Sequence, residues 1–312
     1  MHQRSTSEFK PQLEHVKIRY LILAHKNPAQ FARLISALET PAAFFYVHID
    51  RRACADDFRK SLADTKGIVH FLEERYYVNW GGFSTVLATL ALMKECLQES
   101  RPDDRVVLLS GQDYPIKSTD HIASFFADHS QKEFVSWWRL PSAAWKTEDD
   151  GKDRYQYYWL IDSLHLRYAE MLFRWQKKLG IKRKLPDFVS PVGGSQWFLL
   201  TAGCGRLILD YCTRNPGFLQ FWSTTRLSDE MFFNTILLNS EISTRVENNG
   251  LKYLDWLKGP EYPRILRLDD FPLVKESQHL FARKVDASIK ESSLLMDKID
   301  REILSLCEKI SV

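Results

Sequence analysis

Apolar, strand-like runs alternate with helical patterns between residues 18 and 138, and this alternation limits the possible folds more than any other feature of the sequence. Strand alternating with helix is typical of a mostly parallel, wound sheet with helices flanking it. The sequence therefore predicts an α/β fold. The predicted strands cover 18–24, 44–49, 68–72, 106–110 and 134–138. The predicted helices cover 29–38, where Asn27 is the expected cap, 85–97 and 121–127.

Polar side chains follow three of these strands at the point where each strand ends. They are His25, Asp50 and Asp113. Ligands of open α/β sheets bind just beyond the carboxyl ends of the strands. A single such residue is usually structural, whereas three at corresponding strand ends predict one wall of a pocket.

The pattern weakens after residue 139. Residues 146–154 are polar and predict a surface loop, and residues 155–178 predict an aromatic-rich helix. A strand then runs through Leu200, followed by a helix over 202–211. Gly193 and Gly194 precede this strand, and glycine at such a position allows a close approach of the backbone to another group.

A further helix is predicted over 228–238, beginning at Ser228-Asp229-Glu230. Ser228 is the expected N-cap, and the helix dipole favours acidic residues in the first turn. This local role explains both carboxylates without any chemistry. A catalytic role for Glu230 stays open at this point.

Composition excludes several classes of protein. The net charge of +3 is too small to indicate nucleic acid as a partner of the whole surface. The five cysteines are odd in number and contain no C-x-x-C, which indicates neither a disulfide framework nor a zinc site. Residues 1–10 lack the apolar core of a signal peptide, and no apolar run approaches the ~20 residues of a membrane span. We expect a cytoplasmic protein.

Residues 171–184 form a basic and aromatic segment that could contact a membrane. Its sequence, MLFRWQKKLGIKRK, contains six basic residues. Such a segment is either a solvated helix end or a surface that touches an anionic membrane. Peripheral contact with the inner face of a membrane is therefore an open alternative.

Common phosphate-binding and hydrolytic motifs are absent from the sequence. It contains no P-loop, no G-x-G-x-x-G, no G-x-S-x-G and no H-E-x-x-H. It also has no D-x-D, the paired carboxylates that hold a hard divalent cation on a nucleotide diphosphate. If the chain binds a diphosphate, arginine and lysine must neutralise it.

Eight short segments resemble, in order, those of the core-2/I-branching β-1,6-N-acetylglucosaminyltransferase family, which includes the peptide O-xylosyltransferases. They lie between Arg19 and Asp286 and read ILAHK, FYVHID, NWGGFS, LLSGQDYPIKS, GGSQWF, LSDEMFFNTILLNS, LKYLDW and LFARK. The chain looks most like a bacterial member that lacks the membrane anchor of the animal enzymes. The resemblance implies a glycosyltransferase-A-like sheet of the metal-independent type, and an inverting mechanism.

The resemblance also implies roles for charged residues. Glu230 corresponds to the family's general base, although Ser228 stands where the family usually has proline. A glutamate at a helix start is expected to be ionised at neutral pH, as a base must be. Arg283 and Lys284 correspond to the residues that bind the diphosphate, and Arg264 to a further upstream arginine. Arg267 is close enough in sequence that the choice between it and Arg264 stays open.

The remaining site residues follow from the same resemblance. His25 and Asp50 fall where the first two strands approach the uridine. The residues expected where donor sugar and acceptor meet are Trp80, Asp113, Gln196 and Trp197. No cofactor is expected, because the UDP-sugar is a substrate. No metal ligand is expected either, because the resemblance is to a metal-independent type.

The expected organisation is an N-terminal tail at 1–16, a glycosyltransferase domain at 17–290 and a C-terminal helix at 291–312. Residues 17–138 form the nucleotide-binding half of the domain, and residues 139–290 the acceptor and catalytic half. The expected function is transfer of GlcNAc or xylose from a UDP-sugar to a hydroxyl of a saccharide or glycan acceptor. This forms a β-linkage, in bacterial surface polysaccharide synthesis. The alternatives are xylosyl transfer to Ser or Thr of a peptide, a nucleotide-sugar hydrolase, and a non-catalytic saccharide-binding protein.

Overall fold

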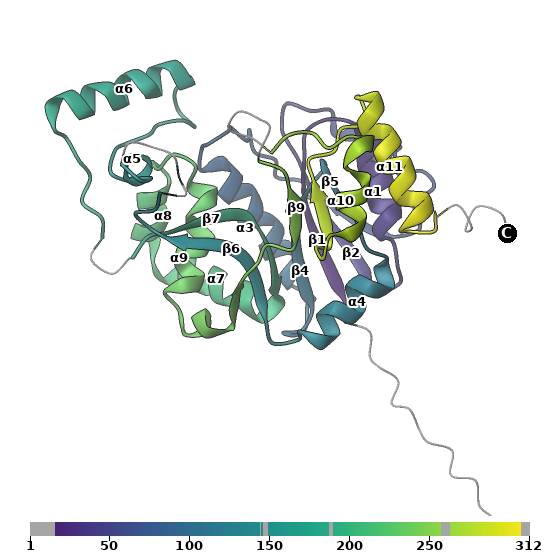
Figure 1. Ribbon diagram of the computed structural model, residues 1–312. Coiled ribbons are helices and arrows are strands. Elements are labelled where there is room, and N and C mark those ends of the chain that lie inside the picture. Colours follow the sequence, from purple (N-terminus) through teal and green to yellow (C-terminus); the bar gives the residue numbers. More distant parts are fainter. Residues whose placement is uncertain (1–15, 144, 146–148, 187–189, 257–262, 307–312) are drawn as a thin grey trace, which may run out of the picture.

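A seven-stranded sheet runs through the centre of the protein (Figure 1). The computed structural model describes residues 16–143, 145, 149–186, 190–256 and 263–306. The strand order is β3-β2-β1-β4-β7-β6-β8, and neighbours pair in parallel except where β7 meets β4 and β6. This confirms the mostly parallel sheet predicted from the sequence. The strands are β1 (Ile18–Ala24), β2 (Ala43–Ile49), β3 (Ile68–Phe71), β4 (Arg105–Ser110), β6 (Glu133–Arg139), β7 (Val192–Thr201) and β8 (Val246–Asn248).

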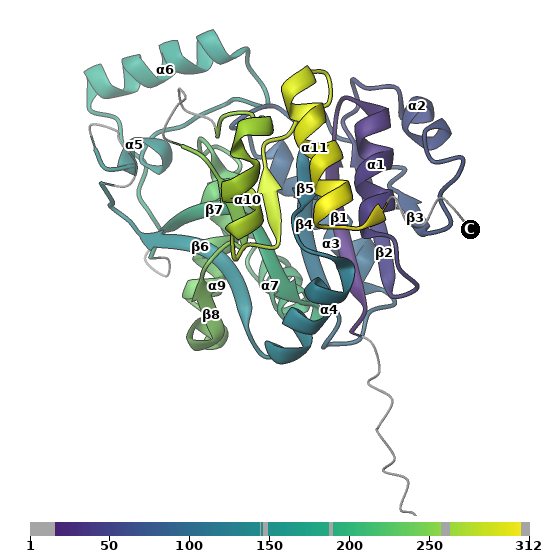
Figure 2. The ribbon, with the colours of Figure 1, turned by 45° about the vertical axis from the view of Figure 1, so that its right-hand side comes forward.

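Helices cover both faces of the sheet (Figures 1 and 2). One core contains side chains of α1 (Pro28–Leu38), α2 (Ala55–Lys60), α4 (Thr119–Asp128), α10 (Phe271–Glu276) and α11 (Lys290–Glu302). The other contains side chains of α3 (Ser84–Leu97), α7 (Ala202–Arg214), α8 (Pro216–Trp222) and α9 (Phe232–Leu238). In β4, Val107 and Leu109 join the first core, and Val106 and Leu108 join the second. Burial on both faces explains why the strand reads as a continuous apolar run.

A second, three-stranded sheet brings distant parts of the chain together. Its strands are β5 (Asp113–Pro115), β9 (Lys252–Leu254) and β10 (Phe281–Arg283), with β10 in the middle. β10 is antiparallel to β5, so that Arg283 lies opposite Asp113, and parallel to β9. The short 3₁₀ turns are η1 (Ser228–Glu230), η2 (Glu241–Arg245) and η3 (Leu268–Asp270).

The helix predicted over residues 155–178 is only partly correct. The structure has a short α5 (Lys152–Tyr155) and then a helix only from Leu166 to Leu179, α6. Between them, alternate residues are buried: Tyr157, Trp159 and Ile161 pack with Phe173 of α6 as a small separate core. A burial period of two requires an extended backbone, which excludes helix there.

Helix ends and caps also differ from the prediction. The helix expected over 228–238 is interrupted at Met231, whose φ of −130° separates η1 from α9. Ser228 is not the expected cap, because its hydroxyl is buried without a hydrogen-bond partner among the described residues. Asn27 stands at the start of α1 but donates its side-chain N–H to Asp286, 3.0 Å away, instead of capping. The C-terminal helix is present as α11 and ends at Glu302.

Both chain ends extend beyond the residues that the structure describes. Residues 1–15 of the expected tail and residues 307–312 of the expected C-terminal helix lie outside the described residues. Among the described residues, no helix has the length and apolar character needed to cross a membrane.

Candidate active site

Polar groups from several strands meet at one edge of the main sheet. The carboxyl ends of β1, β2 and β4 lie there, since these strands are parallel and in register. β7 runs the opposite way, and Gly194 near its start pairs with Trp137 near the end of β6. The reversal therefore brings Gln196 and Trp197 toward the same edge as His25 and Asp50.

A buried cluster of charges lies where the two sheets meet. The carboxylate of Asp113 accepts hydrogen bonds from the Ser110 N–H, 2.6 Å away, and from Lys252 Nζ, 2.9 Å away. Arg283 Nη1 lies 3.4 Å from the other Asp113 oxygen and also donates to the Ser110 hydroxyl. The Trp197 ring covers both cations, with Lys252 Nζ at 4.1 Å and the Arg283 guanidinium carbon at 4.4 Å from its centroid.

Lys252 is the member of this cluster that the sequence reasoning missed as a site residue. Its side chain is only 2% exposed, and burial lowers its pKa to about 8 although Asp113 opposes the shift. The only sequence signal is its place in the LKYLDW segment, where a lone lysine looks like a solvated residue. Asp113, which was predicted to lie where donor sugar and acceptor meet, is fully buried, and its contacts are with the protein. A direct contact with a sugar would require the turn at Ser110 to open.

More positive charge surrounds His25 at the same edge. Burial lowers the pKa of His25, and Lys26, Lys284 and Arg283 lower it further, while Asp50 acts in the opposite direction. Burial likewise lowers the pKa of Lys284, with further contributions from Arg283 and Lys26. Arg283 and Lys284, the predicted diphosphate ligands, thus lie close enough to His25 to lower its pKa. Several cations within one field suit a ligand that carries several negative charges.

The Asp50 side chain binds the loop that follows β3. It accepts hydrogen bonds from the Val78 N–H at 2.9 Å and the Arg52 N–H at 2.8 Å, and it pairs with the Arg52 guanidinium. His48, two residues earlier, accepts the Tyr76 N–H at 2.8 Å, and burial lowers its pKa to about 4. A neutral His48 and the side-chain oxygens of Asp50 thus fix the loop leading to Trp80.

Glu230 pairs with an arginine that the sequence reasoning had assigned to a surface loop. Arg154 Nη1 lies 2.5 Å from Glu230 Oε2, and its guanidinium stacks 3.8 Å from the centroid of the Trp145 ring. Arg154 is only 14% exposed, so the surface-loop prediction is wrong for this residue. The Glu230 side chain is 31% exposed; its partial burial raises its pKa, and Arg154 acts against that rise.

Asp229, next to Glu230, is buried. Burial and the neighbouring charge of Glu230 raise its pKa to about 7. One of its oxygens lacks a hydrogen-bond partner among the described residues. The pKa values of both neighbouring carboxyls are thus raised, that of Asp229 to about 7, whereas the sequence argument considered only the helix start and expected Glu230 to be ionised at neutral pH.

The start of β7 connects the acidic and the cationic groups. The Asn234 side-chain amide donates to the Ser195 carbonyl at 3.0 Å and to the Glu230 carbonyl at 3.3 Å. Two residues beyond Ser195, the Trp197 ring contacts Arg283. One short segment, Ser195 to Trp197, is thus linked through Asn234 to the backbone of Glu230 near one end, and it contacts the cations near the other.

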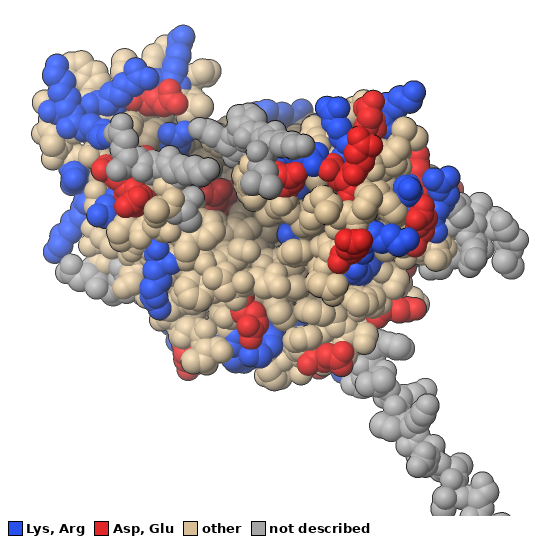
Figure 3. Space-filling view, viewed as in Figure 1, with Lys and Arg blue, Asp and Glu red and all other residues tan. Residues whose placement is uncertain are grey.

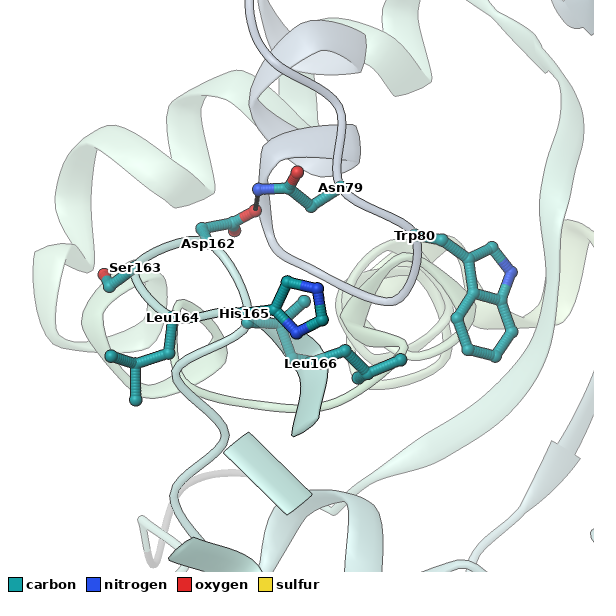
Figure 4. A pocket seen from close by; sticks show the side chains of 8 residues that line it. Asn79, Trp80, Asp162, Ser163, Leu164, His165 and Leu166 are labelled. Carbon is teal, nitrogen blue, oxygen red and sulfur yellow. Dashed lines mark hydrogen bonds between the residues drawn. The ribbon is translucent and has the colours of Figure 1, made fainter. Parts of the chain in front are cut away.

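Trp80 lies in the Asn79-Trp80-Gly81-Gly82 turn beside this region. Gly81 has a φ of +77°, and its carbonyl accepts the Leu227 N–H at 2.8 Å, three residues before Glu230. Trp80, 49% exposed, lines a surface pocket of about 370 Å³ together with residues 161–166 (Figure 4). The Asn79 amide donates to Asp162 across one side of this pocket.

Arg264 is held by two carboxylates. Its Nε lies 2.6 Å from Asp255 Oδ2, its Nη1 lies 2.8 Å from Asp270 Oδ2, and its Nη2 contacts the other Asp270 oxygen. The Leu266 N–H donates to the Lys284 carbonyl at 2.8 Å, so the segment from Arg264 to Arg267 lies alongside Lys284. Arg264 would contact a diphosphate only in competition with Asp255 and Asp270. Arg267 is exposed.

Among the described residues, no three His, Cys, Asp or Glu side chains gather in a way that could hold a metal ion. Independence from metal stays a prediction.

The sequence is similar to those of known proteins. The Core-2/I-Branching enzyme family matches residues 18–274. Xylosyltransferase 1 of Canis lupus familiaris is 27% identical over 253 residues, which are 77% of this chain and 24% of that protein. Xylosyltransferase oxt of Drosophila melanogaster is 24% identical over 314 residues, covering 91% of this chain and 33% of that protein. The chain thus spans between a quarter and a third of the length of these relatives.

Solved structures overlap only partly with this one. S. aureus TarS has a TM-score of 0.34 at 10% identity, covering 92% of this chain and 39% of that chain. Core-mannan synthase A from Aspergillus fumigatus, in an Mn/GDP form, has a TM-score of 0.39 at 9% identity, covering 91% of this chain and 85% of that chain. The assignment of family depends on the sequence match, which extends from β1 into α10. By that match, the chain belongs to the Core-2/I-Branching enzyme family of glycosyltransferases.

Proposed function

We propose that the protein is an inverting glycosyltransferase that moves a sugar from a UDP-sugar to an acceptor hydroxyl and forms a β-linkage. The observation that carries the proposal is the Ser195–Trp197 segment: the Asn234 amide links the Ser195 carbonyl to the backbone carbonyl of Glu230, and Arg283 stacks on the Trp197 ring. In the proposed arrangement, a sugar lying along this segment has Glu230 on its acceptor side. Its leaving diphosphate would lie on the cationic side.

The chemistry needs one base and one positive field. As the acceptor oxygen attacks the anomeric carbon from the side opposite the diphosphate, Glu230 takes the hydroxyl proton. The bond from the anomeric carbon to the diphosphate oxygen breaks, and the departing UDP gains negative charge. Arg283 and Lys284 stabilise that charge as fixed cations, in place of a divalent ion. Arg154 orients Glu230 and opposes the rise in its pKa, which favours the ionised form that a base requires.

The donor and the acceptor are the finer part of the proposal. Similarity to xylosyltransferases supports xylose as the transferred sugar, and GlcNAc is the other candidate. The exposed Trp80 ring supplies a flat apolar surface of the kind on which sugars stack. A saccharide hydroxyl in bacterial surface polysaccharide synthesis is the proposed acceptor. The alternative, which the same similarity supports, is a Ser or Thr hydroxyl of a peptide.

Replacing the proposed base tests this function. We expect Glu230→Gln to lower the rate of UDP release in the presence of acceptor by about a hundredfold or more, since loss of a general base typically costs that much. UDP binding, measured by isothermal titration calorimetry, should stay within about twofold of the unmodified protein, a small free-energy difference. Both UDP-xylose and UDP-GlcNAc are offered as donors, with saccharide and Ser-containing peptide acceptors.

Matched variants separate this result from general damage. Glu241→Gln alters an exposed glutamate of η2 and should leave turnover unchanged. Unchanged turnover in Glu230→Gln would remove the base assignment. UDP release that is independent of any acceptor would identify a hydrolase, and UDP-sugar binding without turnover would identify a non-catalytic saccharide-binding protein.

A further inference from the structure

Helix α6 stands apart from the rest of the molecule. In both ribbon views it lies along the outer side of the region around α5, away from the main sheet (Figures 1 and 2). Its inner face is fixed to the protein: the Phe173 ring stacks on Trp159 with centroids 4.5 Å apart, and the Gln176 amide donates to the Tyr158 carbonyl at 2.9 Å. The fold therefore needs only one face of this helix.

The outer face of α6 carries an apolar stripe. Met171, Trp175 and Leu179 follow each other at intervals of four, which places them on one side of a helix. Their exposed fractions are 52%, 57% and 63%. Tyr168, at 44%, precedes Met171 by one turn, and Ile181, at 47%, follows the end of the helix. Contiguous exposure of large apolar side chains marks an interaction surface.

Positive charge accompanies this stripe. Residues 166–184 contain seven basic side chains and a single acidic one, Glu170, although the whole chain has a net charge of only +3. The rest of the chain consequently has more acidic than basic residues. Figure 3 shows Lys and Arg side chains gathered over the raised helix. Arg174 and Lys178 flank the stripe, with Lys178 Nζ 5.9 Å from the centroid of the Trp175 ring.

We propose that α6 is a membrane-docking element that places Met171, Trp175 and Leu179 in the interface of an anionic lipid surface. Apolar side chains on one face with lysine and arginine beside them are what an interfacial helix needs. The basic residues match the negative surface potential of anionic lipids. A protein partner would not need this local excess of charge, which makes a lipid surface the better fit. The proposal goes beyond the proposed function and does not depend on it.

If α6 lies on a membrane, the surface pocket beside Trp80 also faces the membrane side. Leu166 begins α6 and, with Leu164 and Trp80, lines the pocket of about 370 Å³ (Figure 4). A lipid surface against α6 would therefore lie near this pocket. An acceptor presented at a membrane would reach the protein from that side.

Sedimentation with lipid vesicles tests the docking. The full chain is mixed with vesicles of phosphatidylcholine alone, or of phosphatidylcholine with phosphatidylglycerol. We expect it to sediment with the second kind at low salt and to be released at high salt, since screening weakens exposed charges. The variant Met171→Gln/Trp175→Gln/Leu179→Gln, which keeps good helix formers, should bind at least about tenfold more weakly. Arg174→Gln/Lys178→Gln should lose several-fold and depend less on salt.

Controls make each outcome decisive. Ile68→Gln/Leu273→Gln removes two apolar side chains that are 51% and 57% exposed elsewhere, and it should bind vesicles like the unmodified protein. Circular dichroism checks that all variants keep their helix content. The proposal is overturned if the unmodified chain stays in the supernatant with anionic vesicles, or if the stripe variant still sediments. It is also overturned if the stripe variant changes only self-association, measured by sedimentation velocity, or only RNA binding.

Discussion

Asp229 shows how a single residue can link the candidate site to stability. Its carboxyl is buried next to Glu230 and has a pKa of about 7, above the ordinary value of 3.8. The folded protein therefore holds this proton more tightly than the unfolded chain does. The contribution of Asp229 to stability is fully present below about pH 4 and is lost as the pH rises through about 7.

Asp229→Asn should remove this pH-dependent loss of stability, because asparagine does not titrate. Relative to the unmodified protein, we expect the free energy of unfolding of the variant to rise between about pH 5 and pH 8, by at least about 1 kcal/mol, because each pKa unit corresponds to about 1.4 kcal/mol. Urea unfolding at several pH values measures the difference. Asp128→Asn, an exposed aspartate at the end of α4, should show no such trend. A difference that is constant with pH would contradict the raised pKa of Asp229.

The resemblance named some charged residues of this region and left others unnamed. Arg283 and Lys284 were expected to bind the diphosphate; in the structure both affect the pKa of His25, and their role as diphosphate ligands stays a prediction. Lys252 and Arg154 were not identified as site residues. Each is buried only because of a partner far away in the chain, Asp113 for Lys252 and Glu230 for Arg154. No local pattern of residues encodes such a pairing.

At the level of elements, β7 depends on glycine. A Cβ built on Gly194 would lie 2.1 Å from the Ser136 carbonyl oxygen and 2.8 Å from the Trp137 Cα, which are backbone atoms of the paired strand β6. The sequence predicted a close approach at this position, and the structure identifies β6 as the neighbour. Gly194→Ala must push the two strands apart.

We expect Gly194→Ala to destabilise the protein by about 3 kcal/mol, at the upper end of what overpacking costs. Transfer should also fall, because the Ser195 carbonyl that accepts from Asn234 moves with β7. Gly217→Ala is the matched control: a Cβ there meets nothing within 4 Å, and alanine in α8 should stabilise by up to about 1 kcal/mol. Equal urea midpoints for Gly194→Ala and the unmodified protein would mean that β6 and β7 tolerate the added atom.

Elements with a clear burial period were predicted best. The β1 run at residues 18–24 and the α1 pattern matched closely, because core burial and local propensity agree there. The reversed direction of β7 was not predicted, since strand direction leaves no trace in the composition of a strand buried on both faces. The three residues of β5 were too short to recognise.

At the scale of the whole molecule, the C-terminal part of the chain completes the N-terminal half. α11 packs in the same core as α1, and Arg33 of α1 pairs with Asp300 of α11 at 2.7 Å. Between them, Val285 donates its N–H to the Gln112 carbonyl at 3.0 Å, just beyond β4. The proposed nucleotide-binding half at 17–138 therefore receives Arg283 and Lys284 from a segment that returns to it across the sheet edge.

The position of Arg283 and Lys284 beside the proposed nucleotide-binding half predicts that they stabilise the leaving diphosphate. The Arg283 guanidinium is held in place by Asp113 and Ser110, and Lys284 follows it directly in the chain. Fixed cations of this kind need no metal to balance a departing nucleoside diphosphate. We expect the rate of sugar transfer to be the same in excess EDTA as in its absence, and added Mn²⁺ to leave it unchanged.

Replacing Arg283, in contrast to removing metal, should lower the rate of transfer, because it removes one of the fixed cations. Arg283→Met should lower transfer by about a hundredfold, the usual cost of removing one preorganised group that stabilises developing charge, and Mn²⁺ should not restore it. Arg214→Met changes an arginine that is 78% exposed at the end of α7 and should behave like the unmodified protein. Loss of transfer in EDTA that Mn²⁺ restores would assign the charge of the leaving group to a bound metal. Arg283 would then act by holding Asp113 rather than by contacting UDP.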